Sequence, residues 1–531
     1  MQRRTFITGG PVVPEENYFV KREQELTDFL KRVEAGKYIV IFAPRQTGKT
    51  TFFYQAISEL QKDPGYIPVA LNFEMYSELE PDEFYLDISE RIKSRIRARL
   101  QKIDVEDKKS IKEWLDAQKI TNHLTFDKFF REFHAQLPKK VFMIIDEFDG
   151  IPQKVIKSFL HTLRQIYHEK KLYPSNNYIH SVGIVGVKSI AQLDFDHTVS
   201  PFNIQDQFSL SNFTVEQVTE LYGQYTDEVG QTFAQEVIEA IYQKTGGQPF
   251  LVNRIAQIMT EEMEIPKDEE ITIEYFHKAY ALILKEDNTH FQHVRRNIRR
   301  DPKFKRILNR ILFDEREFYF NINDSYMSEL KTYGLVREDK YGLCVIDTPI
   351  YQQIIVKTFT PTINGVEDEY LPKSAGSLTD YLSPGGEIQM DELISNFRDF
   401  IFRAGYKILE VPETPKEFVG QYLLLAYLDL FVRKIGGYLY PEVPTGRGRM
   451  DIVILYHDEK HIVETKLWHG EKRYQSGKRQ LAEYLAKESV NRGYYIVFDH
   501  RQTSECQYES DLVDGKEIIS YCIPIPSVDT I

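Results

Sequence analysis

The chain has 531 residues, which is enough for several domains with separate hydrophobic cores. Its formal net charge of -13 excludes a surface that is basic throughout, although one basic groove remains compatible with that total. Three widely spaced cysteines (Cys344, Cys506 and Cys522) argue against zinc ribbons and disulfide scaffolds and fit a reducing cytoplasm. No run approaches the roughly 20 apolar residues of a bilayer span, and the first residues lack the apolar segment of a signal peptide. We therefore expect a cytoplasmic protein with no membrane partner.

A phosphate-binding loop is predicted within residues 38–53, after an irregular lead-in over 1–20 and a helix over about 22–35. The segment begins with a short apolar run rich in β-branched residues, as a central parallel strand should. Pro44 and Gly48 interrupt this run, and helical residues follow. Strand, tight loop and helix start in this order are the phosphate-loop pattern. The residues expected to bind the nucleotide are Ala43, Pro44, Arg45, Gln46, Thr47, Gly48, Lys49, Thr50 and Thr51.

The chemistry of phosphate binding explains this spacing. Backbone N–H groups of the loop surround the phosphates, and the helix N-terminus beyond Gly48 adds its partial positive charge. Lys49 is expected to reach the β and γ phosphates, and the Thr50 hydroxyl to ligate Mg²⁺. Ala43 stands where the first glycine of the pattern is usual. A chance Gly-Lys-Thr at a helix start is the alternative, which the strand and loop before it disfavour. The segment predicts ATP and Mg²⁺ as cofactors.

Two adjacent carboxylates follow the next decisive strand. A strand over about 66–73 and a charged helical region over about 81–137 come first, and an apolar run then ends at Asp146 and Glu147. We expect Asp146 to hold Mg²⁺ through water and Glu147 to polarise the attacking water. An acidic strand end alone is more often a solvated cap. After a phosphate loop in a series of strands and helices, the catalytic interpretation is favoured.

Strands that alternate with helices predict an α/β fold with a parallel sheet and the nucleotide at its carboxyl edge. A further buried strand is predicted over 180–187, followed by helical residues from 214 to about 285 with an interruption at 245–250. Lys188 or Ser189, at the end of that strand, is a candidate sensor of the γ-phosphate. Ordinary loop residues are an equally good interpretation of the pair.

Four ordered motifs resemble the archaeal-type, AAA-like ATPases of the signal-transducing P-loop class. The motifs are APRQTGKT, IIDEFDGIP, SPFNI and TGGQPFLV, and together they cover roughly residues 10–290. The resemblance implies that a turn from Gly247 to Pro249 packs near the nucleotide, which adds Pro249 to the expected nucleotide-binding residues. It also raises a homo-oligomer or an activating protein as a partner, with Arg164 and Arg254 as candidates for an arginine finger.

A winged helix and a linker are predicted between the two halves of the chain. Residues 302–357 read as two helices and a small hairpin, a pattern that resembles a winged helix. Such a module can bind DNA, and the basic run 295–300 precedes it. The resemblance to this ATPase class implies instead a switch element packed on the nucleotide domain, and we favour that role over direct base reading because no recognition helix stands out. Glycine, proline and acidic residues over 359–390 predict the linker.

A second group of charged residues is predicted on a hairpin near the C-terminus. Two apolar strands flank a polar turn at 457–460, and alternation places Glu464 and Lys466 on one face. A turn of that length sets Asp451 opposite Lys466 and diagonal to Glu464. Two carboxylates suit Mg²⁺, a hard cation that keeps several waters. Lys466 is then expected to position or activate the attacking water.

The helix after this hairpin carries Gln480 and Tyr484 one turn apart on one face. The order Asp, Glu-x-Lys, Gln-x-x-x-Tyr resembles the PD-(D/E)XK nucleases, and its last motif their RecB-like branch, over roughly residues 390–530. The resemblance implies that Asp451 and Glu464 are ligands of Mg²⁺, with Mn²⁺ as a substitute. It implies that Lys466 is catalytic. It also implies that Gln480 and Tyr484 support the site or the substrate phosphate.

Several residues around this site keep two interpretations. The superfamily usually has an upstream helical acid, for which Glu417 is the candidate. Trp468 and His469 either stack on a base or pack in the core. Basic side chains beside the hairpin either neutralise a nucleic-acid backbone or form a solvated rim. These are Arg447, Arg449, Lys472, Arg473, Lys478 and Arg479. The fold also includes inactive binding relatives.

The expected architecture is a P-loop parallel-sheet ATPase with a helical lid and a winged helix, followed by a restriction-endonuclease-like α/β domain. The expected boundaries are 1–205 for the ATPase core, 206–290 for the lid, 291–358 for the winged helix, 359–390 for the linker and 391–531 for the nuclease-like domain.

The main hypothesis is an ATP-binding and ATP-hydrolysing, Mg²⁺-dependent nuclease whose nucleotide state regulates the C-terminal site. Its partner is nucleic acid, DNA foremost, and a role in prokaryotic genome defence is what the resemblance of such a fusion implies. An alternative is a nucleotide-gated switch that holds nucleic acid or a partner without cutting. A third is remodelling driven by hydrolysis, with a vestigial nuclease.

Overall fold

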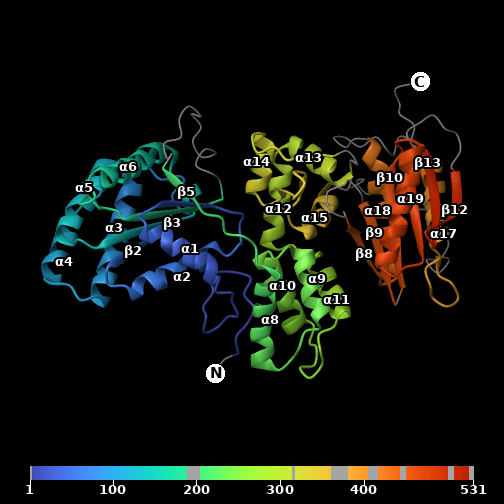
Figure 1. Ribbon diagram of the computed structural model, residues 1–531, viewed down its shortest axis with the longest axis horizontal. Coiled ribbons are helices and arrows are strands. Elements are labelled where there is room, and N and C mark those ends of the chain that lie inside the picture. Colours follow the sequence, from blue (N-terminus) through green and yellow to red (C-terminus); the bar gives the residue numbers. More distant parts are fainter. Residues whose placement is uncertain are drawn as a thin grey trace. The chain divides into compact units, whose positions relative to one another are not determined.

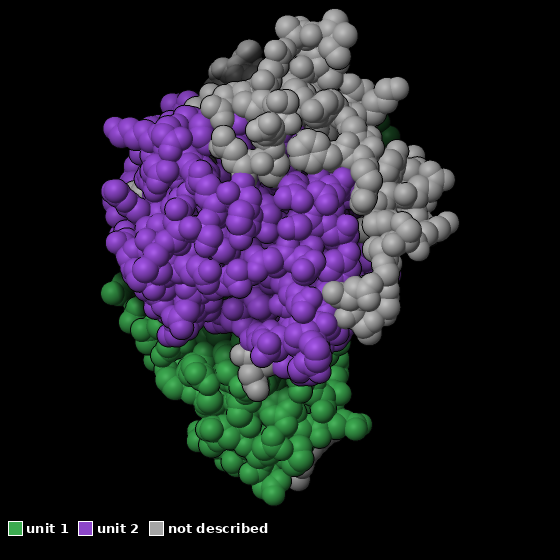
Figure 2. Space-filling view, turned by 90° about the vertical axis from the view of Figure 1, so that its right-hand side faces the viewer, with its two compact units in different colours: residues 1–283, 332–334 green, residues 284–331, 335–531 purple. Residues whose placement is uncertain are grey.

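The computed structural model describes residues 3–187, 204–313, 317–359, 381–404, 416–442, 450–457, 459–499 and 507–524. The chain forms two compact units, which Figure 2 colours separately. Unit 1 is Met1–Ile283 with Thr332–Gly334, and unit 2 is Leu284–Lys331 with Leu335–Ile531. Within the described ranges, no helix combines the length and the apolar character that crossing a membrane requires.

Unit 1 is built on a five-stranded sheet in which every pair of neighbours is parallel and the order is β2-β3-β4-β1-β5. The strands are β1 (Tyr38–Phe42), β2 (Tyr66–Asn72), β3 (Lys140–Asp146), β4 (Ser181–Gly186) and β5 (Gln205–Gln207). Because β4 lies between β1 and β3, the loops after β1 and β3 share the carboxyl edge and are one strand apart. The predicted α/β fold with a parallel sheet is confirmed.

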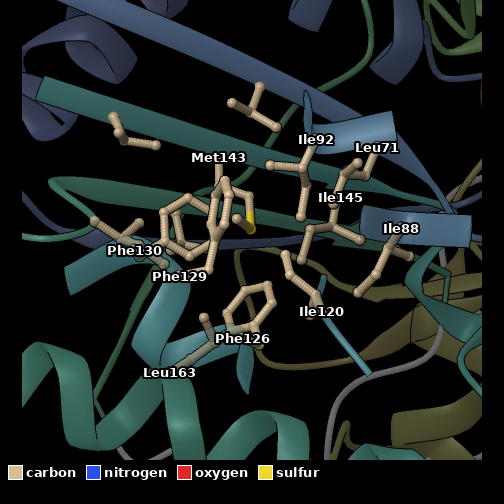
Figure 3. Packing of buried hydrophobic residues seen from close by; sticks show 14 of the residues in the cluster. Leu71, Ile88, Ile92, Ile120, Phe126, Phe129, Phe130, Met143, Ile145 and Leu163 are labelled. Carbon is tan, nitrogen blue, oxygen red and sulfur yellow. The ribbon is translucent and has the colours of Figure 1, made fainter. Parts of the chain in front are cut away.

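Helices cover both faces of this sheet because successive strand residues enter opposite cores. Tyr38 and Val40 of β1 pack with one set of helices, whereas Ile39 and Ile41 pack with the other. The larger core contains α3, α4, α5 and α6, and Figure 3 shows its phenylalanines and isoleucines packed against β3. The helices are α1 (Glu23–Glu34) and α2 (Lys49–Lys62) on one face, and α3 (Pro81–Lys102), α4 (Lys108–Ala117), α5 (His123–Gln136) and α6 (Gln153–Leu172) on the other.

A helical lid completes unit 1. It consists of α8 (Val215–Val229), α9 (Gln235–Thr245), α10 (Pro249–Gln257), a π-helical turn (Ile258–Glu262) and α11 (Ile273–Ile283). Helix α9 ends at Thr245, and its C-cap residue Gly246 adopts a left-handed φ of 57°, two residues before α10 begins. The predicted interruption at 245–250 is present, but the stretch is also broken between α8 and α9 and between the π-helical turn and α11, where a continuous helical region was expected.

Unit 2 begins with a group of helices and a small hairpin. These elements are α12 (Thr289–Arg299), α13 (Pro302–Phe313), α14 (Ser325–Thr332), the antiparallel pair β6 (Val336–Glu338) and β7 (Cys344–Ile346), and α15 (Pro349–Phe359). The predicted order of helix, helix and hairpin is present. His290 and Tyr351 join α12 to α15 through a hydrogen bond of 2.7 Å. Burial lowers the pKa of His290 to about 3, so this histidine is neutral and structural.

The remainder of unit 2 is a six-stranded mixed sheet in the order β12-β13-β11-β10-β9-β8. Its strands are β8 (Tyr438–Glu442), β9 (Met450–Tyr456), β10 (Glu459–Leu467), β11 (Arg492–Asp499), β12 (Gln507–Val513) and β13 (Lys516–Pro524), and its helices are α17 (Met390–Ala404), α18 (Lys416–Lys434) and α19 (Glu471–Lys487) (Figure 1). Thr465 accepts a hydrogen bond from Gln421 of α18, and its neighbour Lys466 contacts Gln480 of α19. These two helices therefore pack on opposite faces of the sheet.

Candidate functional site

The loop after β1 has the backbone conformation that a phosphate loop requires. Gly48 precedes α2 with a left-handed φ of 82°, and Gln46 adopts a φ of 60° although it carries a side chain. Ala43 keeps a negative φ, and its N–H bonds to the Gly186 carbonyl at 3.3 Å. Alanine therefore fits where the pattern usually has glycine, because this position needs no left-handed backbone.

Lys49 is buried, and its Nζ donates to the carbonyls of Ala43 and Pro44 at 2.7 Å each. Burial lowers the pKa of this lysine to about 8, against the attraction of Glu147, Asp146 and Asp149. The hydrogen bonds of this ammonium group go to neutral carbonyls. A polyphosphate bound in the loop would replace them with charged partners and favour the protonated lysine.

Thr50 and Asp146 come together across the sheet edge. The Thr50 hydroxyl donates to Asp146 Oδ2 at 3.0 Å, so the first turn of α2 meets the end of β3. Hydroxyl and carboxylate oxygens are the ligands that Mg²⁺ prefers beside nucleotide phosphates. The residues present therefore fit a nucleotide with Mg²⁺.

Glu147 occupies a strained backbone position at the same edge. It adopts a left-handed φ of 49°, and its N–H bonds to Asp146 Oδ1 at 2.9 Å. Burial raises the pKa of its carboxyl group, although the positive charge of Arg45 opposes that shift. A carboxylate with a raised pKa is suited to accept a proton from water.

Two further contacts fix the loop after β3. Asp149 accepts the Val187 N–H at 2.6 Å, which ties this loop to the end of β4. Gly150 lies so close to Phe73 that an added Cβ would stand 2.0 Å from its carbonyl oxygen. The IIDEFDGIP motif thus carries residues that hold the loop after β3 in place as well as the two carboxylates themselves. The sensor candidates Lys188 and Ser189 lie outside the described residues.

The turn between α9 and α10 reaches the phosphate loop, as the resemblance implied. Gly247 packs against Phe213, where an added Cβ would stand 1.9 Å from the carbonyl oxygen. Gln248 donates from Nε2 to the Gln46 carbonyl at 3.1 Å. Pro249 is the first residue of α10 and contributes to the wall of the neighbouring hollow.

This hollow of about 780 Å³, including its mouth, lies beside the phosphate loop and is lined largely by apolar side chains. The N-terminal segment, α2 and the lid all contribute to it; its lining includes Val12, Phe19, Gly48, Gln55, Phe250 and Asn253. Sequence reasoning missed most of these residues. The N-terminal segment carries no recognisable motif, and only its folding beside α2 and the lid brings these residues together.

Arg22 is a further residue that the motifs did not reveal. It is buried and left-handed with a φ of 51°, and it donates to the carbonyls of Ser211 at 2.6 Å and Thr47 at 3.2 Å. Burial lowers the pKa of its guanidinium to about 10. Arg22 therefore supports the phosphate loop through its hydrogen bond to the Thr47 carbonyl. The expected arginine candidates are engaged elsewhere: Arg254 pairs with Glu262, and Arg164 contacts His168.

In unit 2, Glu464, Lys466 and Gln480 come together as predicted. Glu464 and Lys466 are 1% and 7% exposed, and Lys466 Nζ lies 3.4 Å from Glu464 Oε1 and 3.4 Å from Gln480 Oε1. Tyr484, one turn further along α19, packs against the hydrophobic cluster of this face. Gly477 has no side chain, which admits the Tyr495 hydroxyl beside Lys466; an added Cβ would stand 2.0 Å from that oxygen.

The predicted register of the hairpin is wrong. We expected a turn over 457–460 with Asp451 opposite Lys466, but Tyr456 pairs with Glu459 and leaves two residues in the turn. His457 adopts a left-handed φ of 50°, as tight hairpin turns require. The shift by two residues keeps Asp451 on the same face and places it directly opposite Glu464.

Other expectations for this site fall partly outside the described residues. For Asp451 and Glu417 only the backbone is described, and Arg447 and Arg449 lie in the gap before β9. Among the side chains that are described, no group of three or more His, Cys, Asp or Glu residues is placed to hold a metal ion. Trp468 is partly buried and packs against the hydrophobic cluster beside Tyr474, with 5.3 Å between ring centroids.

A parallel sheet with a phosphate loop after β1 and paired carboxylates after β3 defines a P-loop nucleoside triphosphatase. The chain belongs to the AAA-like domain family, whose model matches residues 7–356. Residues 388–502 match a second family model, described as a domain of unknown function (DUF8371).

An uncharacterized WD repeat-containing protein of Synechocystis is 24% identical over 271 residues, which are 50% of this chain and 22% of that protein. The chain thus spans about a fifth of this relative's length. A Walker-type ATPase of Pyrococcus abyssi is similar in structure, with a TM-score of 0.46, 14% identity and coverage of 66% of this chain and 99% of that chain. The ORC2 protein of Aeropyrum pernix is similar with a TM-score of 0.37 and 12% identity, over 65% of this chain and 96% of that chain. The RuvB Holliday junction branch migration motor of Thermotoga maritima is similar with a TM-score of 0.33 and 13% identity, over 64% of this chain and 96% of that chain.

Proposed function

We propose that unit 1 binds and hydrolyses ATP. The observation that carries this proposal is the hydrogen bond from Thr50 to Asp146, because it joins the two motifs on which phosphoryl transfer depends. Mg²⁺ bound between these two side chains would compensate the negative charge of the phosphates. Lys49 exchanges its carbonyl partners for the phosphates, and Glu147 accepts a proton from the attacking water.

The test compares two lysines of the same helix. Lys49→Ala should abolish ATP hydrolysis, because the buried cation is lost. Lys62→Ala is the matched control, since Lys62 is exposed at the other end of α2 and pairs only with Glu59 among the ion pairs of the described residues. Phosphate release is measured with Mg²⁺ and with chelator. Hydrolysis that survives in Lys49→Ala would refute the assignment of the site.

We infer that unit 2 cleaves phosphodiester bonds and that the nucleotide state of unit 1 regulates this cleavage. Support comes from the packing of Glu464, Lys466 and Gln480 and from the register that sets Asp451 opposite Glu464. Bound Mg²⁺ would supply a Lewis acid at the two acidic positions. Lys466 would then position the attacking water, and Gln480 would orient Lys466. The substrate is nucleic acid, DNA foremost.

A cleavage assay decides this second proposal. Plasmid, linear duplex, and single-stranded DNA and RNA are incubated with Mg²⁺ or Mn²⁺, with and without ATP. Cleavage should disappear in Lys466→Ala and persist in Lys460→Ala, a control on the same strand whose partner is the surface residue Glu488. Dependence of the rate on ATP would establish the regulation. Equal cleavage by both variants would show that the activity does not come from this site.

A second function is a switch that binds nucleic acid or a partner without cutting. The burial of Glu464 and Lys466 and the ion pair between them favour it, because such a pair can also be a structural element. This function predicts salt-sensitive DNA binding that chelators leave unchanged. A homo-oligomer or an activating protein is a further proposed partner, which light scattering with and without ATP would detect. A role in genome defence rests on the resemblance alone.

A further inference from the structure

We propose that Tyr495 is a positioning residue of the cleavage site in unit 2, and that its hydroxyl group holds the Lys466 ammonium in the orientation that the reaction requires. The proposal rests on the proposed cleavage of phosphodiester bonds and adds a residue to that site. Tyr495 lies on β11, outside the motifs that predict the site. Its register partner on β10 is Glu464, so its side chain lies on the same face of the sheet as Glu464 and Lys466.

A glycine inside α19 makes room for this hydroxyl group. Gly477 is buried in the interior of the helix, where glycine is less favourable than alanine. A Cβ added to Gly477 would stand 2.0 Å from the Tyr495 hydroxyl oxygen and 3.1 Å from Lys466 Nζ. The hydroxyl oxygen and the ammonium nitrogen therefore lie close to the same point on the helix surface. Any side chain at position 477 would displace the hydroxyl group.

Two other polar groups beside Lys466 define the orientation of its ammonium group only loosely. Nζ lies 3.4 Å from Glu464 Oε1 and 3.4 Å from Gln480 Oε1, and both distances are longer than a usual N–H···O hydrogen bond. Because the lysine stem is flexible, such long contacts fix its end poorly. A phenol oxygen can accept a hydrogen bond from an ammonium group. Tyr495 is 1% exposed and its ring packs beside Tyr474, so it offers this oxygen from a fixed position.

Because Tyr495 is buried, its hydroxyl group acts on the reaction through Lys466 and not by contact with the nucleic acid. Tyr495→Phe removes one oxygen and keeps the ring. This substitution should lower kcat by about tenfold, the effect of losing one hydrogen bond to a charged group, with little change in KM or Tm. Cleavage is measured with Mg²⁺ on whichever of plasmid, linear duplex, single-stranded DNA or RNA the wild-type protein cuts fastest.

Tyr494→Phe is the matched control. Tyr494 is the preceding residue of β11 and is also buried, but its side chain points to the opposite face of the sheet. This variant should keep the wild-type kcat. A loss of kcat as large as that in Tyr495→Phe would overturn the positioning role, because the effect would then be one of packing.

A pair of double variants moves the hydroxyl group from the strand to the helix. The Tyr495 ring carbon Cζ lies 2.7 Å from the place of a Gly477 Cβ, so the ring must be removed before position 477 can carry a side chain. Tyr495→Leu with Gly477→Ser supplies an oxygen beside Lys466 from α19. Tyr495→Leu with Gly477→Ala has nearly the same packing without the oxygen. The first double variant should therefore cleave severalfold faster than the second at equal KM.

The outcomes separate the positioning role from the proposed cleavage itself. A wild-type kcat in folded Tyr495→Phe, or an equal kcat in the two double variants, would overturn the positioning role and leave the cleavage standing. A wild-type protein that cuts none of the nucleic acids would refute the proposed cleavage and the positioning role with it. That result is visible before any variant is compared.

Discussion

Gln248 donates a hydrogen bond from its side-chain amide to the backbone carbonyl of Gln46, with 3.1 Å between nitrogen and oxygen. The oxygen of the same amide accepts the Leu251 N–H at 2.8 Å and so caps α10. One side chain therefore connects the lid to the phosphate loop while it starts a lid helix. Any movement of the loop on nucleotide binding must either carry this contact with it or break it.

Substitutions of Gln248 separate its two roles. Gln248→Ser keeps an N-cap acceptor but cannot reach Gln46, so it should change nucleotide affinity severalfold with little change in stability. Gln248→Ala also removes the cap and should lower the free energy of unfolding by about 1 kcal/mol. Nucleotide titration and denaturant unfolding measure the two effects. Wild-type affinity in both variants would show that the contact does not connect the lid to nucleotide binding.

Glu147→Gln should retain nucleotide binding and lower the hydrolysis rate by about 10²–10⁴-fold, the usual contribution of a general base. The raised pKa of Glu147 also predicts a pH dependence. The base must be ionised, so hydrolysis should fall on acidification at a higher pH than for an unperturbed glutamate. The hydrolysis rate measured from pH 4 to pH 8 shows where this acidic decline occurs. Hydrolysis by Glu147→Gln at the wild-type rate would exclude the proposed role.

Nucleotide binding should take up a proton in mildly alkaline solution. Lys49 has a pKa lowered to about 8 by burial, so above that pH it is largely neutral in the free protein. Phosphates favour the charged form and raise its pKa, so binding at pH 8.5 consumes a proton, whereas binding at pH 7 does not. Affinity should therefore decline as the pH rises above 8. Calorimetry with MgADP in buffers of different ionisation enthalpy measures the uptake, and equal proton numbers at both pH values would contradict it.

A pair of glycine substitutions isolates the packing of the lid turn. Gly247 and Gly230 both adopt left-handed backbone, with φ values of 69° and 86°. An alanine Cβ at Gly247 would meet the Phe213 carbonyl, whereas one at Gly230 has nothing within 4 Å. Gly230→Ala should lower the free energy of unfolding by about 1–2 kcal/mol, because alanine disfavours left-handed backbone. Gly247→Ala should lower it distinctly more, because its Cβ also meets the Phe213 carbonyl. Thermal unfolding compares them, and equal losses would show that the turn can yield.

The sequence predicts the nucleotide motifs well because their signals are local. A β-branched run before the loop, and a second run that ends in carboxylates, specify strand ends that a parallel sheet must bring to one edge. Thr50 and Asp146 meet there as expected. The hollow beside the loop was not predicted, because Arg22, Gln55 and Asn253 come from three separate segments and carry no mutual spacing.

The C-terminal sheet was predicted only in its centre. Glu-x-Lys alternation on β10 and the polar spacing on α19 suffice to bring Lys466 to Gln480. The register of the β9–β10 hairpin depends on how many residues the turn uses, and the sequence allows a longer turn than the pairing of Tyr456 with Glu459 leaves. Strands β12 and β13 were not predicted at all; β12 is at the edge, with Tyr508 and Leu512 exposed.

The place of β4 between β1 and β3 also sets a dimension. Neighbouring strands are roughly 4.8 Å apart, so the backbones of β1 and β3 are separated by roughly 10 Å at the edge where both motifs end. The first turn of α2 crosses that distance through Thr50, whose hydroxyl donates to Asp146. β4 thus acts as a spacer whose width is fixed by backbone hydrogen bonds and not by side chains. Substitutions in the loops can alter which side chains lie between the ends of β1 and β3. The distance between these two strands, however, can change only if a strand leaves the sheet.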